Sequence, residues 1–206
     1  MIESVAKGVC LNQIKGVIEL DTRQYFEGFN ESLKEYLEDK ENIRDLLAAI
    51  EMIKSTKKRG KKIILVGNGG SSAIAEHMAI DLTKNAGLRA MAISGTPQLT
   101  TFANDYGYDK VYSKGIEAFA DKGDVLIAIS SGGTSKNILN AVAAARKIGC
   151  EVITFSAFEK NNPLRKKGNI NIYLNSKAYG YVEIIHNLLI HYINDQIIGA
   201  AVYKFR

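Results

Sequence analysis

Apolar and polar positions along the chain follow two different patterns. Between residues 21 and 58, apolar side chains recur every three or four positions, which predicts amphipathic helices at 21–39 and 41–58. After residue 60, short apolar runs alternate with segments of helical spacing. The runs lie at 63–66, 90–93, 125–129, 152–155 and 170–174, and the helical segments lie at 71–86, 97–120 with a break near Gly107, 135–148 and 180–203. This alternation is typical of parallel strands buried on both faces. We therefore predict an α/β three-layer sandwich with a five-stranded parallel sheet, preceded by N-terminal helices.

The domain organisation follows from the continuity of this pattern. No linker rich in proline or glycine, low-complexity tract or internal repeat interrupts it, which predicts a single domain over 1–206. Within that domain we expect an N-terminal arm at 1–20, helices at 21–58 and an α/β core at 61–203. The first 20 residues have no clear period, and either an arm or a short helix packed on a partner subunit would fit them.

Composition narrows the class of protein. Hydrophobic residues make up 46% of the chain and charged residues 24%, as in ordinary globular proteins. No apolar run reaches the roughly 18 residues that span a bilayer, and the first residues do not resemble a signal peptide. Two cysteines, Cys10 and Cys150, are too few for a disulfide framework and suit a reducing compartment. We therefore expect a cytoplasmic location and no membrane partner.

The net charge of +5 is spread over short basic runs at 57–62 and 165–167. Nucleic-acid binding would need tighter clustering and interleaved aromatic residues, so we expect no nucleic-acid partner. A mild positive field is also convenient for a phosphorylated substrate.

Two turns rich in glycine and serine follow predicted strands. GNGGSS, at 67–72, ends the first strand and opens a helix, and SSGGTS, at 130–135, does the same after the third strand. Backbone N–H groups at a helix start have no intrahelical partner, and glycine permits close approach of a ligand. Ser71 and Ser72 can cap the helix or bind phosphate oxygens. Neither G-x-G-x-x-G nor the P-loop pattern of triphosphatases occurs. Because the carboxyl ends of parallel strands share one edge, both turns predict a pocket for a phosphorylated small molecule.

Three blocks of sequence carry a resemblance to a known family. GNGGS followed after four residues by EHM, then NDYGY, then DVLIAISSGGTS, resembles the sugar isomerase (SIS) domain, in its phosphoheptose isomerase branch, over residues 25–200. The resemblance implies the flavodoxin-like SIS fold and a homotetramer with active sites between subunits. It also implies the aldose–ketose isomerisation of sedoheptulose 7-phosphate to D-glycero-D-manno-heptose 7-phosphate, for lipopolysaccharide and other surface polysaccharides.

The resemblance also implies which residues bind the substrate. The phosphate would be held by the hydroxyl groups of Ser71, Ser130 and Ser135, within a loop that also contains Ser131 and Gly132. Gly132 stands where the family usually has serine, so one hydroxyl is lost. The sugar would be lined by Asn68, Gly69, Gly70, Asn104 and Asp105.

The reaction needs a base near two neighbouring carbons and a group that polarises the carbonyl oxygen. All three histidines, His77, His186 and His191, fall on two predicted helices. His77 and Asp81 share a helix face at i, i+4, and Glu183 and His191 lie in one row of the last helix.

The family binds zinc at the positions of His77, Asp81, Glu183 and His191, where Asp81 and Glu183 replace the usual Glu and Gln. We therefore expect catalytic groups among Asp81, Glu183 and His191, with Glu183 as the base if Asp81 cannot reach the substrate. Zinc fits this residue set, and no nucleotide cofactor is expected.

Alternatives remain open at the level of the sequence. His77 with Asp81 would also fit a helix-surface pair, His191 a core histidine, His186 a packing residue and Glu183 a first-turn carboxylate. The segment SKAYGYVEII is shorter than in the heptose branch, so the enzyme would also fit another ketose phosphate. Some relatives are non-catalytic scaffolds for the replication initiator protein, and others are sugar-phosphate sensors with a DNA-binding domain. Four titratable groups at the motif positions favour an enzyme.

Overall fold

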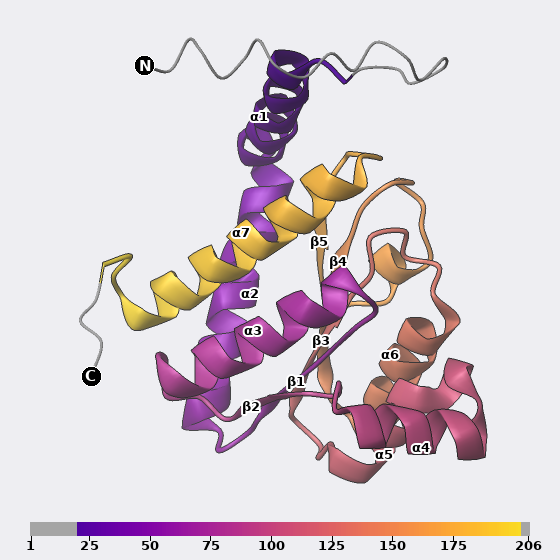
Figure 1. The fold of residues 1–206 in the computed structure, drawn as a ribbon. Helices are drawn as coiled ribbons and strands as arrows, with labels where there is room; N and C mark the ends of the chain where they lie inside the picture. Colours follow the sequence, from indigo (N-terminus) through magenta and orange to yellow (C-terminus); the bar gives the residue numbers. More distant parts are fainter. Residues whose placement is uncertain (1–19, 203–206) are drawn as a thin grey trace, which may run out of the picture.

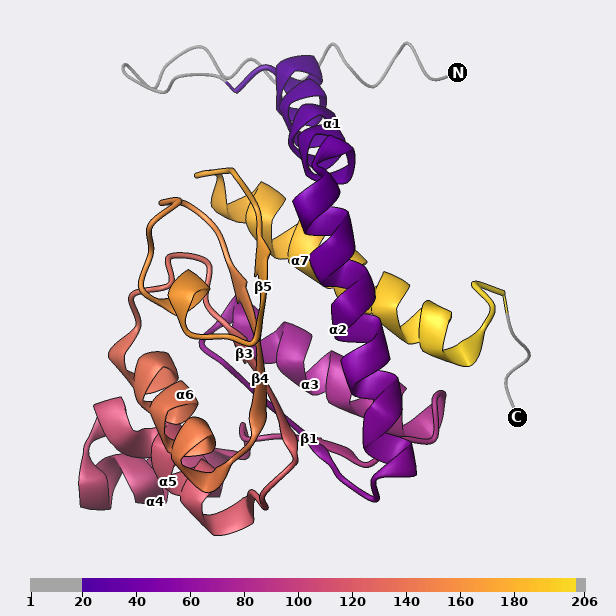
Figure 2. The same ribbon diagram turned by 180° about the vertical axis from the view of Figure 1, so that it is seen from behind.

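The computed structural model describes residues 20–202 and has a parallel sheet between two layers of helices (Figures 1 and 2). The strand order is β2-β1-β3-β4-β5, and all neighbours are parallel. The strands are β1 Ile63–Gly67, β2 Ala90–Ala92, β3 Val125–Ile129, β4 Glu151–Ser156 and β5 Ile170–Tyr173. The predicted α/β class and five-stranded parallel sheet are confirmed. The predicted arm lies almost entirely outside the described residues.

Helices cover both faces of this sheet. One layer contains α2 Lys40–Lys58, α3 Gly70–Lys84 and α7 Tyr179–Ile198, and α1 Thr22–Glu38 extends from it past the sheet (Figure 2). The opposite layer contains α4 Thr96–Tyr106, α5 Val111–Phe119 and α6 Lys136–Ile148. Short 3-10 helices span Tyr108–Lys110 and Leu164–Lys166. None of the helices within residues 20–202 is long and apolar enough to cross a membrane.

Alternating side chains of each strand build two separate cores. Ile63 and Leu65 of β1 pack with α2, α3 and α7, whereas Ile64 and Val66 pack with α5 and α6. Successive residues of a strand point to opposite faces, so a strand buried on both sides must be apolar throughout. This requirement explains why the strand signal in the sequence was a continuous apolar run.

Caps and glycines set the ends of the helices. Asp21 caps α1 by accepting from the Gln24 N–H at 2.7 Å, and Asp39 ends α1 and caps α2. The predicted break at Gly107 is confirmed, since its φ of 86° ends α4. The last helix ends at Ile198 and not at 203 as predicted, because Gly199 adopts the left-handed conformation.

The register aligns the ends of the strands that precede the glycine–serine turns. Gly67 of β1 pairs with Ile129 of β3, and Ile129 pairs with Phe155 of β4. The turns that follow β1 and β3 therefore leave the sheet side by side, at its carboxyl edge. This edge is where ligands bind in open parallel sheets.

Candidate active site

The two glycine–serine turns enclose a cavity of about 170 Å³ at the carboxyl edge of the sheet. α7 closes its other side. Among its lining residues no Lys or Arg is present, and Glu183 is the one carboxylate. The lining residues are Asn68, Ser71, Ile129, Ser130, Ser131, Gly132, Thr134, Ser135, Tyr179 and Glu183. An anion in this cavity would therefore be bound by hydroxyl and backbone N–H groups.

Both helices that start at the cavity have N-termini without a side-chain cap. The N-cap of α3 is Gly69, with φ of 55°, and the N-cap of α6 is Ser135; neither helix has a side-chain cap hydrogen bond. Ser71 and Ser72 therefore do not cap α3, which corrects one of the two roles expected of them. The Ser71 and Ser72 N–H groups donate to the carbonyls of Asn68 and Gly69, so the two helix dipoles and the remaining N–H groups at one cavity favour a phosphate group.

The serines of the cavity are largely buried. Ser71, Ser130 and Ser131 are each less than 9% exposed, and Ser130 Oγ donates to Ser135 Oγ at 3.4 Å. Their hydroxyl groups offer further donors beside the helix N-termini. This is the set that the sequence predicted for the phosphate, now brought to one place.

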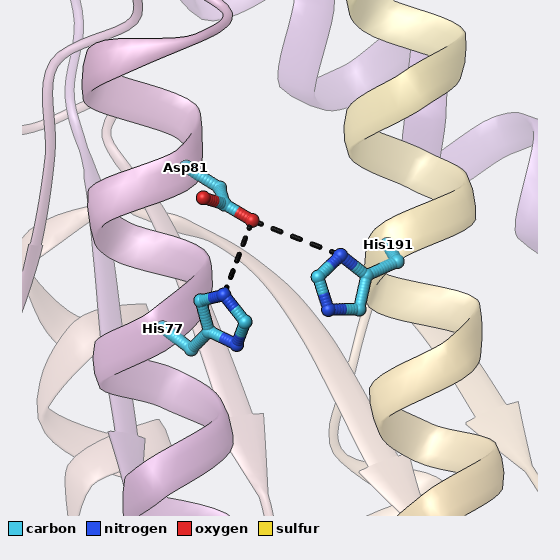
Figure 3. A group of neighbouring side chains, drawn as sticks. All are labelled: His77, Asp81 and His191. Atoms are coloured by element: carbon cyan, nitrogen blue, oxygen red, sulfur yellow. Dashed lines mark ion pairs between the residues drawn. The ribbon is translucent and has the colours of Figure 1, made fainter. Parts of the chain in front are cut away.

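A second group of side chains lies between α3 and α7 (Figure 3). Asp81 Oδ2 lies 3.5 Å from His77 Nε2 and 3.7 Å from His191 Nδ1. One donor atom from each residue lies within 4.8 Å of the others. The side chains of His77 and His191 are 52% and 40% exposed, so His191 is not a core histidine. Two imidazoles and a carboxylate at this spacing fit a divalent cation such as zinc.

Glu183 lies outside that group and borders the cavity between the two glycine–serine turns. The predicted four-residue shell therefore contains three residues in this structure. Glu183 also lines an adjoining groove with Gly70, His77 and Asn187. A Cβ atom on Gly70 would approach Glu183 Oε1 to 2.6 Å, so a larger residue here would displace the carboxylate from this position. The negative charge lies against the N-terminus of α3, where the helix dipole stabilises it.

Asn104 and Asp105 do not reach the cavity within the described chain. Both are exposed on α4, and Asn104 Nδ2 donates to Asp105 Oδ1 at 2.9 Å. The NDYGY block contacts the site through Tyr108 instead, whose hydroxyl donates to Asn68 Oδ1 at 3.1 Å. Tyr108 was not among the predicted site residues, although the NDYGY motif that contains it was recognised.

His186 lies in the core, away from the other two histidines. Its ring packs edge-on against Phe155, and burial lowers its pKa to about 4. It is therefore a packing residue, which is the reading that the sequence favoured for it.

Comparison with known proteins agrees with this fold. The SIS domain family model matches residues 24–157, so the chain is a SIS-domain protein. Phosphoheptose isomerase of Aliarcobacter butzleri is 35% identical over 175 residues, which cover 78% of this chain and 92% of that protein. The structure of phosphoheptose isomerase from Neisseria gonorrhoeae superposes with a TM-score of 0.80 at 29% identity, over 86% of this chain and 97% of that one. A Francisella tularensis phosphoheptose isomerase gives 0.79 at 26% identity, over 86% of this chain and 95% of that one. The chain belongs to the phosphoheptose isomerase family.

Proposed function

We propose that the chain converts sedoheptulose 7-phosphate to D-glycero-D-manno-heptose 7-phosphate. One observation carries this proposal: the phosphate cavity and the groove beside His77 share Glu183 as a wall. A substrate whose phosphate occupies the cavity extends past Glu183 towards the His77–Asp81–His191 cluster. The phosphate and the reacting carbons of the sugar lie at opposite ends of the molecule, which suits a site of this length. Family membership supports the same reaction.

Glu183 is the better base of the two carboxylates. The ketose loses a proton from C1, which returns to C2 through an enediol(ate), while a second proton moves between the two oxygens. The Asp81 carboxylate already lies beside two imidazoles. Glu183 has no hydrogen bond or ion pair to any other residue between 20 and 202, so its carboxylate remains available for the C1 proton. Without metal, His191, which Asp81 orients, is placed for proton exchange at the oxygens.

Zinc would be held by His77, Asp81 and His191. Two imidazoles and one carboxylate leave a coordination position open, as catalytic zinc sites do. When bound, the ion would polarise a substrate oxygen as a Lewis acid. Glu183 is not needed as a ligand in this arrangement, which leaves it free for proton transfer.

The site is open on a side that is rich in exposed apolar residues. They come from α1, α2 and α7, and border a hollow of about 290 Å³: Leu37, Leu47, Leu188 and Tyr192. Exposed Ile184 belongs to the groove beside Glu183, so this apolar face adjoins the site. A second copy that covers the face would also close the groove. We infer a homo-oligomer with sites between subunits, a tetramer by the resemblance, that acts in the cytoplasm in the supply of heptose for surface polysaccharide.

One assay tests reaction, base and metal together. Turnover of sedoheptulose 7-phosphate is measured for the wild type and Glu183→Gln, with added zinc and after chelation. We expect Glu183→Gln to lower kcat at least about 100-fold with KM nearly unchanged, and chelation to lower turnover of the wild type. Glu76→Gln, at an exposed carboxylate of α3 outside the cavity, is the matched control.

The outcomes separate the parts of this proposal. Full turnover by Glu183→Gln would exclude Glu183 as the base, and turnover that survives chelation would exclude the zinc site. Turnover of another ketose phosphate alone would change the substrate. No turnover of any ketose phosphate would favour the scaffold function.

A further inference from the structure

We propose that Asn137 is a positioning residue that holds the two glycine–serine turns, 67–72 and 130–135, at a fixed separation. We call these turns the phosphate-binding loops. It acts through Asn68, whose side chain belongs to the first loop. The inference rests on the proposed function, because it concerns the same phosphate cavity. Asn137 itself is not among the residues that line that cavity.

The two asparagine side chains form a reciprocal pair. Asn68 Nδ2 donates to Asn137 Oδ1 at 3.0 Å, and Asn137 Nδ2 donates to Asn68 Oδ1 at 2.9 Å. The partners are 69 positions apart in sequence, so the pair joins two separate βα units. Asn137 is only 3% exposed. Loss of the Asn68 side chain would therefore leave the buried Nδ2 of Asn137 without its hydrogen bond.

Neighbouring donors fix the orientation of both amides. Asn68 Oδ1 also accepts from the Tyr108 hydroxyl at 3.1 Å, and Asn137 Oδ1 also accepts from the Ile138 N–H at 2.9 Å. Each oxygen thereby uses both of its lone pairs. The Tyr112 hydroxyl donates to the carbonyl of Gly67, the residue before Asn68. Both lone pairs of Asn68 Oδ1 therefore accept hydrogen bonds from this protein, and the side chain holds the first turn against α6.

The pair lies where two helix N-termini meet the cavity. Asn68 directly precedes Gly69, the N-cap of α3, and Asn137 lies in the first turn of α6, after its N-cap Ser135. A phosphate that binds to both N-termini needs them at a constant separation, within a few tenths of an ångström. The asparagine pair directly links the first turn to the start of α6, the helix that follows the second turn. It therefore determines phosphate affinity without touching the phosphate.

The test is a double-mutant cycle with two readouts. We expect Asn137→Leu, which keeps the side-chain size, to raise KM for sedoheptulose 7-phosphate about tenfold and leave kcat little changed. Binding of inorganic phosphate, measured by calorimetry, should weaken by a similar factor. In an Asn68→Leu background, Asn137→Leu should have a much smaller effect on either quantity, because the contact between the two side chains is already lost.

Asn140→Leu is the matched control. Asn140 lies one turn further along α6 and donates to the Asp109 carbonyl at 2.8 Å, and within residues 20–202 its side chain has no hydrogen bond to either phosphate-binding loop. It should leave KM and phosphate affinity unchanged. Thermal melting of each variant shows whether it is folded, and Asn137→Asp provides a second variant if the leucine variant unfolds.

The outcomes distinguish this inference from the proposed function. Unchanged phosphate affinity in folded Asn137→Leu, or equal effects with and without Asn68, would overturn the role of the pair. If the wild type binds phosphate but does not turn over the heptulose phosphate, the isomerase proposal fails. In that case the cycle on phosphate binding still decides whether Asn137 acts as proposed.

Discussion

At the scale of single residues, two adjacent glycines of the second glycine–serine turn are under opposite constraints. A Cβ on Gly132 would lie 3.6 Å from the Phe158 ring, which is an ordinary contact, and its φ is not positive. Gly133 has φ of 64°, and a Cβ there would overlap the amide of Asn162. We predict that Gly132→Ser folds normally and lowers KM about fivefold, because it adds a hydroxyl donor for the phosphate. Gly133→Ser should cost at least about 2 kcal/mol of unfolding free energy.

Steady-state kinetics and urea unfolding of the two variants check this prediction. They differ by one position and introduce the same side chain, so each is the control for the other. A rise of KM in Gly132→Ser would mean that the phosphate does not bind beside this position. Equal stabilities of the two variants would contradict the backbone argument.

At the scale of elements, the existence and type of the helices and strands could be predicted from the sequence, but some of their ends could not. Both patterns were strong because the strands other than the partly buried β2 are buried on two faces, and most helices on one. The end of α7 was missed by five residues, since the apolar spacing continues past Gly199 although the backbone does not. β2 was predicted one residue too long, at 90–93, for the same reason: Ile93 is buried but lies beyond the strand.

The buried face of α7 carries a histidine, which makes this element sensitive to acid. Burial lowers the pKa of His186 from 6.5 to about 4, so the unfolded chain binds its proton first as the pH falls. The contribution of His186 to the free energy of unfolding is therefore fully present above pH 6.5 and declines as the pH falls towards 4. Relative to neutral pH, the loss at pH 5 is about 2 kcal/mol from this group. We predict that His186→Phe, which keeps a ring against Phe155, removes that part of the loss in urea unfolding at pH 7 and 5.

The carboxylate of Asp124 provides an internal comparison for this measurement. Burial raises the pKa of Asp124, but hydrogen bonds from Lys62 and from the Asp121 N–H outweigh it and hold that pKa below 3.8. The contribution of Asp124 to the free energy of unfolding is therefore lost at a pH below the range from 7 to 5. An identical loss between pH 7 and 5 in wild type and His186→Phe would contradict the assignment to His186.

At the scale of the whole molecule, the site could be predicted only in part. Local motifs indicated the two glycine–serine turns, and helical spacing indicated His77 with Asp81. Contacts between distant segments left no such signal. The pairing of Asn68 with Asn137 and the position of Glu183 against Gly70 depend on how α6 and α7 pack against the sheet. Spacing along the chain contains no information on that packing.

Subunit association can be tested at Leu188, on the apolar face of the molecule. Leu188 on α7 is 44% exposed and borders the apolar hollow between α1, α2 and α7. A charge there would have to be buried if a second copy covers this face, which disfavours association. We predict that Leu188→Glu sediments as a smaller species than the wild type and loses turnover, while its circular dichroism stays unchanged.

Phe119→Glu is the control, because Phe119 is 41% exposed at the end of α5, in the opposite helical layer. It should keep the wild-type size and activity. If Leu188→Glu also kept both, the apolar face would not be the interface between subunits. If it became smaller but remained fully active, the site would be complete within one chain, and the open groove beside Glu183 would need no partner.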